Sequence, residues 1–203
     1  MEILVGRNAV REALRAGRRR VDRLLLAEGV ERKGIIADIL YLCQQRGIGV
    51  QTTRRDELDR LGDEHHQGVA ARVSDYPYVA LEELLAVAAE RGEMPFFLAL
   101  DSLQDPQNVG SLLRTAEAVG VHGVILPERR AVAITPAVSR ASAGAVEHLR
   151  VAQVTNLART LDALKAQGLW VVGVEDHPRA QDYRQADLNI PLVRVLGSEG
   201  EGL

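Results

Sequence analysis

The sequence has little of three kinds of residue. Of its 203 residues, one is cysteine (Cys43), two are lysine and 3% are aromatic. A single cysteine excludes a disulfide within the chain and a thiolate metal site, so we interpret Cys43 as a small buried hydrophobic side chain. Because aromatic rings are scarce, Leu, Val, Ala and Ile must fill the core that a 46% hydrophobic composition allows.

Long apolar runs are also missing. No run approaches the length of a membrane span, and the first residues, MEILVGRNAV, lack the apolar region of a signal peptide. We therefore expect a cytoplasmic protein that does not enter a membrane.

Several motifs of well-known sites do not occur. The histidines at positions 65, 66, 122, 148 and 177 do not have the spacing of metal ligands, so we expect no metal. There is no Gly-x-Ser-x-Gly turn of a hydrolase, no Gly-x-Gly-x-x-Gly that opens a helix, and no P-loop. These absences disfavour a hydrolase and a generic nucleotide-binding protein.

The basic residues are almost all arginine, and they are distributed unevenly. The net charge is −3, which disfavours a nucleic-acid binder when the chain is taken as a whole. Residues 1–74, however, carry 14 Arg and Lys against 11 Asp and Glu, whereas residues 75–203 carry 11 against 17. If the protein binds RNA, residues 1–74 are the better candidate for the RNA-binding surface on electrostatic grounds. The run Arg18, Arg19 and Arg20 either contacts RNA or is an ordinary solvated surface.

The hydrophobic pattern predicts two α/β regions joined by a linker. In residues 1–74, helical patterns over 6–17 and 33–47 alternate with short apolar strands. Residues 74–95 contain two prolines and an amphipathic helix. From residue 95 onward, apolar strands alternate with helices, one of them over 134–147, which predicts a parallel sheet covered by helices. Ligands of such sheets bind at the carboxyl ends of the strands.

The first candidate site follows a strand that ends in Asp101, in the stretch LDSLQDPQNVGSLLR. Asn108 is placed to cap the next helix. Gly110 lies one turn before Arg114, so its missing side chain leaves room for a ligand beside the guanidinium. Spacing alone favours the plainer interpretation of a cap, a tolerated glycine and a solvated arginine.

Two further stretches are rich in small residues. In VLGSEGEGL (195–203) the glycines permit close backbone approach, and the two glutamates disfavour a phosphate but suit a cationic ligand; the alternative is a surface turn. In SRASAGAVEHL (139–149) the small side chains allow close packing against a second subunit or a backbone, unless the stretch is only a helix end.

Together these stretches resemble the SpoU/TrmH family of knotted (SPOUT) RNA ribose 2′-O-methyltransferases. The resemblance lies in LDSLQDPQNVGSLLRTAEAVGVHGVILP, SAGAVEHLRVAQVTNLARTL, HQGVAARV, VLGSEGEGL and GRNAVREAL, and so covers the whole chain. It points to the subgroup that methylates a guanosine ribose in 23S rRNA. It implies an L30e-like RNA-binding domain at 1–74, a linker and helix at 75–94, and a SPOUT methyltransferase domain with a trefoil knot at 95–203.

The resemblance also implies the partners and the site. S-adenosylmethionine (SAM) is the methyl donor, no metal takes part, 23S rRNA is the substrate and the protein is a homodimer. The family's motif positions correspond to catalytic residues Asn108, Arg114 and Glu199, and its SAM loop corresponds to Leu196, Gly197, Ser198, Glu199 and Gly202. In the positively charged first part we further predict the RNA-binding residues Arg7, Arg18, Arg19, Arg20 and His66.

Two roles for Arg114 stay open. As a general base it would have to give up a proton, which a guanidinium with a pKa above about 12 resists. As a clamp it would hold the phosphate beside the target ribose and set the geometry of transfer.

One feature departs from the family. Its third motif, an SLN-type segment, follows the second, whereas this sequence stops at Leu203. We therefore expect the C-terminal knot segment to be absent from this chain and the site to be half enclosed. Without that motif, a non-catalytic RNA-binding or ribosome-assembly protein is a rival interpretation, and a tRNA or other-site ribose methyltransferase is another.

Overall fold

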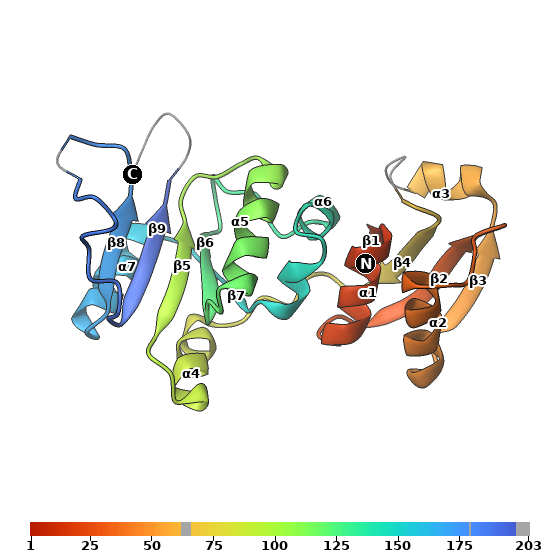
Figure 1. Ribbon diagram of the computed structural model, residues 1–203, viewed down its shortest axis with the longest axis horizontal. Coiled ribbons are helices and arrows are strands. Elements are labelled where there is room, and N and C mark those ends of the chain that lie inside the picture. Colours follow the sequence, from red (N-terminus) through yellow and green to blue (C-terminus); the bar gives the residue numbers. More distant parts are fainter. Residues whose placement is uncertain (62–65, 179, 198–203) are drawn as a thin grey trace. The chain divides into compact units, whose positions relative to one another are not determined.

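The computed structural model describes residues 1–61, 66–178 and 180–197 (Figure 1). Contacts between residues divide the chain into two compact units. The first unit consists of Met1–Pro77, Val109–Arg114 and Ile134–His148, and the second consists of Tyr78–Asn108, Thr115–Ala133 and Leu149–Leu203. Two short segments from beyond residue 95 therefore belong with the N-terminal residues.

The first unit is built on a mixed four-stranded sheet with the order β1-β4-β2-β3. β2 and β3 are parallel, whereas β4 runs antiparallel to both β1 and β2. The sequence pattern does not predict β1, because four residues are too few to show an alternation. The elements are β1 (Glu2–Val5), α1 (Arg7–Ala16), β2 (Val21–Ala27), α2 (Ile35–Gln45), β3 (Gly49–Thr53), α3 (Arg55–Leu61) and β4 (Val69–Val73).

Helices α1 and α2 share one hydrophobic core with this sheet. α1 buries Val10 and Leu14, which lie four residues apart on one helix face, and they join Leu24 of β2 in the core. Because side chains alternate along a strand, Leu25 points to the opposite face, where it clusters with Leu58 of α3. The sheet is thus covered on both faces.

Cys43 lies in the core between α2 and the sheet. Its side chain is fully buried, which confirms its interpretation as a small hydrophobic residue. Burial raises the pKa of its thiol to about 11, so the thiol stays protonated and is a poor nucleophile.

The segment 134–148 of the first unit differs from its prediction. A single helix over 134–147 is wrong: the structure has α6 (Pro136–Ala141), which Thr135 caps, and then a separate 3-10 turn, Ala145–His148. The helix breaks where Ala143 and Gly144 adopt φ of +53° and +85°. This left-handed backbone turns the chain back within the small-residue stretch.

The second unit is built on a five-stranded sheet with the order β7-β6-β5-β9-β8 (Figure 1). Every pair of neighbouring strands is parallel, which confirms the predicted parallel sheet. The elements are α4 (Leu81–Arg91), β5 (Phe96–Leu100), α5 (Pro106–Ala118, whose middle part belongs to the first unit), β6 (Gly123–Pro127), β7 (Val151–Val154), α7 (Leu157–Ala166), β8 (Trp170–Val174) and β9 (Leu192–Leu196).

Helices α4 and α7 pack on this sheet in a single core. Leu84 of α4 and Leu164 of α7 are fully buried beside Phe97 of β5 and Val193 of β9. Gly123 allows α4 to approach closely, since a Cβ atom there would lie 2.4 Å from Leu84 Cδ1. No helix in the described ranges is long and apolar enough to span a membrane.

Candidate functional site

The two motif stretches at 100–114 and 195–203 begin side by side at the carboxyl edge of the five-stranded sheet. Leu100 of β5 and Leu196 of β9 are register partners, and the Asp101 amide donates a hydrogen bond to the Leu196 carbonyl at 2.8 Å. The prediction that both stretches follow strand ends of one parallel sheet is thus confirmed. Leu196 and Gly197 are half-buried here. Ser198, Glu199 and Gly202 lie outside the described residues.

A cavity of about 690 Å³ opens at this edge of the second unit. Its wall is mainly apolar, and its polar groups come from the loops that follow β5, β6 and β7. The apolar lining includes Leu157, Ala158, Leu161, Val171 and Val195, and the charged and hydroxyl-bearing lining includes Asp101, Ser102, Arg129, Arg130 and Thr155. An apolar wall with a few polar groups at one end is typical of a small-molecule site.

The start of α5 is fixed by a residue other than the predicted one. Asp105 is the N-cap, and its carboxylate accepts hydrogen bonds from the Gln107 and Asn108 amides at 3.1 and 3.3 Å. Pro106 occupies the first helical position. The prediction that Asn108 caps α5 is therefore wrong; Asn108 lies in the first turn with its side chain exposed. The Asp-Pro pair is the sequence signal that could have located the cap.

Gly110 serves helix packing. A Cβ atom at this position would lie 2.4 Å from the Ala141 Cβ and 2.8 Å from both the Ala141 carbonyl carbon and the Ser142 nitrogen. The expectation that Gly110 leaves room for a ligand beside Arg114 is therefore wrong, because backbone of the 134–148 segment fills that room. Close packing of the small residues at 141–145 is confirmed, and Gly144 adds a second close approach, 3.0 Å from its Cβ position to the Asn8 carbonyl oxygen.

Arg114 lies further along α5, on the exposed side of the helix. Within the residues that the structure describes, its guanidinium has no hydrogen-bond or ion-pair partner. An exposed guanidinium without a partner in the protein is available to an external anion.

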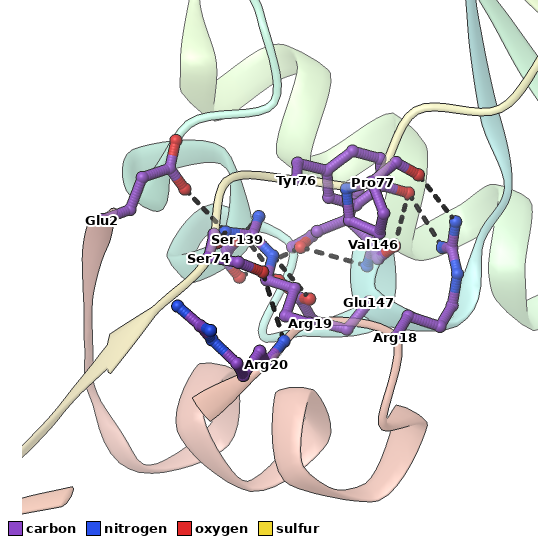
Figure 2. Close-up of polar contacts among 11 residues, drawn as sticks. Glu2, Arg18, Arg19, Arg20, Ser74, Tyr76, Pro77, Ser139, Val146 and Glu147 are labelled. Atoms are coloured by element: carbon purple, nitrogen blue, oxygen red, sulfur yellow. Dashed lines mark hydrogen bonds and ion pairs between the residues drawn. The ribbon is translucent and has the colours of Figure 1, made fainter. Parts of the chain in front are cut away.

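Arg19 is enclosed within the first unit (Figure 2). Its side chain is 0% exposed, and its Nη1 donates to the Glu2 carboxylate at 2.6 Å and to the Ser74 carbonyl at 3.3 Å. Its Nε lies 3.0 Å from Glu147 Oε2, an ion pair by distance that lacks hydrogen-bond alignment. The prediction that Arg19 contacts RNA is therefore wrong: this residue balances two internal carboxylates.

Other polar groups complete this buried cluster. Ser139 Oγ donates to Glu147 Oε1 at 2.9 Å, and Tyr76 Oη donates to the Val146 carbonyl at 3.2 Å (Figure 2). Burial raises the pKa of Glu147, although the Arg19 charge opposes the shift, and burial raises the pKa of Tyr76 to about 12. We call Glu2, Arg19, Tyr76, Ser139 and Glu147 the Arg19 cluster; it fastens the 134–148 segment to the N-terminal residues.

The two neighbouring arginines differ from Arg19. Arg18 is half-buried and donates to Tyr76 Oη and to the Pro77 carbonyl, both at 3.1 Å. Arg20 is exposed, and its Nη2 approaches the Met1 sulfur at 3.9 Å. Of the predicted run of RNA-binding arginines, Arg20 is thus the most accessible.

The other two predicted RNA-binding residues have opposite environments. Arg7 is exposed, and its Nε donates to the Gln67 carbonyl at 3.1 Å. His66 is 1% exposed; its Nδ1 accepts a hydrogen bond from the Gly68 amide and its Nε2 lies 2.9 Å from Asp59. The prediction that His66 contacts RNA is therefore wrong, because its ring is buried and supports the turn before β4.

The described ranges contain no group of three or more His, Cys, Asp or Glu side chains that could hold a metal ion. Arg129 and Arg130 in the cavity lining are not among the predicted site residues. A signal for them exists in the sequence, since Glu128, Arg129 and Arg130 directly follow the apolar strand at 121–127 and thus also fall at a carboxyl strand end.

Two sequence families match this chain. Residues 3–79 match "RNA 2'-O ribose methyltransferase substrate binding", and residues 95–203 match the SpoU rRNA Methylase family. Among named relatives, the Bacillus subtilis (strain 168) protein YacO, a candidate TrmH family tRNA/rRNA methyltransferase, is 46% identical over 202 residues, which cover 100% of this chain and 80% of that protein. A relative with the same family name from Staphylococcus aureus (strain MSSA476) is 44% identical over 99% of this chain and 80% of its own.

Solved structures share the fold. The SpoU methyltransferase AviRb from Streptomyces viridochromogenes, in complex with the cofactor AdoMet, superposes with a TM-score of 0.78 at 22% identity, over 99% of this chain and 74% of that one. A candidate RNA methyltransferase of the TrmH family from Porphyromonas gingivalis gives a TM-score of 0.72 at 26% identity, over 100% and 74% of the two chains. The family matches and the two relatives agree: this chain is a methyltransferase of the SpoU/TrmH family, with a substrate-binding N-terminal domain and a parallel-sheet SPOUT domain.

Proposed function

We propose that this protein transfers the methyl group of SAM to the ribose 2′-oxygen of a guanosine in 23S rRNA. The observation that carries the proposal is the carboxyl edge of the five-stranded sheet. There the loops after β5 and β9 begin as neighbours, joined by the hydrogen bond from Asp101 to Leu196, beside a cavity of about 690 Å³. A parallel α/β sheet binds its ligand at this edge.

The residues of the cavity fit SAM. The adenosine part of SAM needs an apolar wall, which Leu161, Val171 and Val195 provide. The Asp101 carboxylate in the same lining is suited to the positive charge of the sulfonium. We assign the cofactor loop to Leu196, Gly197, Ser198, Glu199 and Gly202, of which the first two lie at this edge. When bound, SAM supplies a methyl group on a sulfonium centre.

The chain's own residues must bind the ribose, orient it and accept its proton. A ribose hydroxyl is a poor nucleophile until a neighbouring group draws off the proton. We assign catalysis to Arg114, Asn108 and Glu199. Arg114 is exposed and free of protein partners in the described ranges, which suits a clamp on the phosphate beside the target ribose. The clamp role needs no loss of a proton; the role of base stays an alternative that the test of Arg114 below addresses.

We propose that RNA is held by the N-terminal domain, residues 1–74, through Arg7, Arg18 and Arg20. The support is the positive balance of that part of the sequence and the exposure of Arg7 and Arg20. We further propose residues 75–94 as linker and helix, residues 95–203 as the methyltransferase domain, and a homodimer as the working form. Sedimentation equilibrium at micromolar concentration tests whether the protein is a dimer. A monomer at this concentration would contradict the proposed homodimer.

A second substrate is favoured by the relatives' names, which refer to both tRNA and rRNA. The test is transfer of labelled methyl from SAM to unmodified 23S rRNA, 16S rRNA and bulk tRNA, followed by nucleoside analysis. We expect label in 23S rRNA as 2′-O-methylguanosine. Label in tRNA alone would replace the rRNA proposal, and RNA binding without transfer to any substrate would support a non-catalytic RNA-binding protein.

A further inference from the structure

Arg129 and Arg130 belong to the lining of the cavity in the second unit. They come two and three residues after the end of β6, the strand next to β5, so they share the carboxyl edge with Asp101 and Ser102. All four residues line the cavity, and both arginines are exposed. The pair therefore belongs to the rim of the cavity and is accessible to a large ligand.

The backbone that carries this pair is held on both sides. The Glu128 amide donates to the Val154 carbonyl at 2.9 Å, and the Val132 amide donates to the Leu103 carbonyl at 2.9 Å. Between these anchors Arg130 adopts φ of +61°, and Ser102 of the same cavity lining adopts φ of +55°. Non-glycine residues seldom adopt such angles, and in folded proteins they gather at ligand sites.

The two guanidinium groups also differ from those of the arginines that form ion pairs within the chain. Arg19, Arg54 and Arg184 each pair with a carboxylate. Neither Arg129 nor Arg130 has a hydrogen-bond or ion-pair partner in the part of the chain that the structure describes. Two adjacent, unpaired positive charges on a fixed loop form a ready site for an anion.

We propose that Arg129 and Arg130 bind phosphates of the RNA strand next to the nucleotide that is methylated, an inference that rests on the function proposed above. A phosphate flanks every ribose on both sides, and Arg forms paired hydrogen bonds with phosphate oxygens. The carboxylate of SAM is the competing anion. The exposure of both side chains on the rim, outside the apolar wall, favours the polymer over the small cofactor.

The test compares two double variants that each remove two positive charges. R129A/R130A changes the rim, and the control R91A/K165A changes two exposed residues that precede β5 and β8, at the opposite, amino edge of the same sheet. For R129A/R130A we expect KM for RNA to rise about tenfold, with kcat and the Kd for SAM within about twofold of wild type. The salt dependence of RNA binding should weaken by about 0.7 in log–log slope for each phosphate that the variant no longer binds. The control variant should change neither quantity.

Three outcomes would overturn the inference. A higher Kd for SAM with unchanged RNA binding would assign the pair to the cofactor, and unchanged affinity for both would make it ordinary solvated surface. An equal loss in R91A/K165A would show a general charge effect. Filter binding measures RNA affinity without methyl transfer, so it tests the phosphate site independently of the proposed function. If the wild-type protein transfers no methyl group, the proposed function is wrong. The phosphate site would still be supported if R129A/R130A then bound RNA more weakly and with a weaker salt dependence.

Discussion

The two sheets of this protein use arginine in opposite ways. Beside the mixed sheet of the first unit, Arg19 is fully buried between Glu2 and Glu147, and Arg18 donates to Tyr76 and a backbone carbonyl. At the carboxyl edge of the parallel sheet, Arg129 and Arg130 are exposed without a protein partner in the described ranges. Arginine therefore supports the fold at the first place and is available to a ligand at the second.

The net charge of a region does not reveal which of its arginines are free to bind a ligand. The excess of basic residues in 1–74 predicts that this part binds RNA, yet Arg19, one of its three adjacent arginines, is buried in ion pairs. The second half is acidic overall and still presents paired arginines at its cavity. The local partners of each guanidinium, rather than the net charge of a region, decide which arginines can meet RNA.

The largest effect is expected from the Arg19 cluster. Replacing Glu147 with Ala leaves the buried Arg19 with half of its counter-charge, and removing one partner of a buried ion pair typically lowers the free energy of unfolding by about 3–5 kcal/mol. Urea unfolding at neutral pH measures it. Asp182, which pairs with Arg184 on the surface, is the control, and its Ala variant should unfold at the wild-type urea concentration. Equal behaviour of the two variants would contradict the structural role of Arg19.

The next largest effect is expected at Arg114 of α5. Arg114→Ala should lower kcat at least about 100-fold, because the ribose loses its orientation, while the Kd for SAM stays within about twofold. Single-turnover transfer and equilibrium dialysis measure the two quantities. Arg91→Ala, an exposed arginine at the amino edge, is the matched control and should be fully active. A Kd for SAM that rises as far as the rate falls would show that Arg114 belongs to the cofactor site.

Activity across pH separates the two roles of Arg114. A clamp keeps its charge throughout, so Arg114→Lys should retain part of the activity with an unchanged pH profile. A base of different proton affinity would instead shift the profile of the Lys variant. A shifted profile would therefore favour the role of base.

The variant Gly110→Ala distinguishes a role of Gly110 in helix packing from a role in leaving space for a ligand. The new Cβ would meet backbone atoms of Ala141 and Ser142 at 2.8 Å, and overpacking of this kind costs about 1–3 kcal/mol. We expect a lower thermal midpoint with an unchanged Kd for SAM. Ala118→Leu, on the exposed side of the same helix, controls for added volume. A stable Gly110→Ala variant with weaker SAM binding would restore the ligand interpretation of this glycine.

The smallest effect concerns Glu12 of α1. Burial alone would raise the pKa of Glu12, but hydrogen bonds from His148 and Arg11 outweigh it and hold the pKa below its usual 4.5. A lowered carboxyl pKa contributes stability above the usual pKa, and this contribution disappears as the pH falls through the folded-state pKa. Glu12→Gln should thus be less stable than wild type at about pH 7 and should equal it near pH 2. A difference that is constant across this range would contradict the assignment.

The fold was predictable where the sequence carries a periodic signal. Continuous apolar strands alternating with helices indicate the parallel sheet, and the positions of LDSLQDPQN and VLGSEGEGL after two of those strands place both at one edge. The strand β1 and the break at Ala143 and Gly144 carry no such signal. A four-residue strand shows no period, and a left-handed turn at an alanine depends on contacts made elsewhere in the fold.

The site was predictable in position but less so in detail. Asn108 suits a cap by residue type, but the Asp-Pro pair three residues earlier is the stronger signal for the start of α5. The roles of Gly110 and Arg19 depend on the segment 134–148, which is distant from both in sequence. No local pattern reveals which side of a helix meets such a segment, so burial of these residues could come only from the structure.

The most direct test of the carboxyl edge as the site of methyl transfer is a photocross-link. A 23S rRNA fragment carrying a photoreactive group at the target guanosine is irradiated with the protein and SAM, and the linked peptides are mapped by mass spectrometry. We predict links to the loops after β5 and β6, at Ser102–Asn108 and Glu128–Arg130. Links confined to the N-terminal residues, with none at this edge, would contradict it.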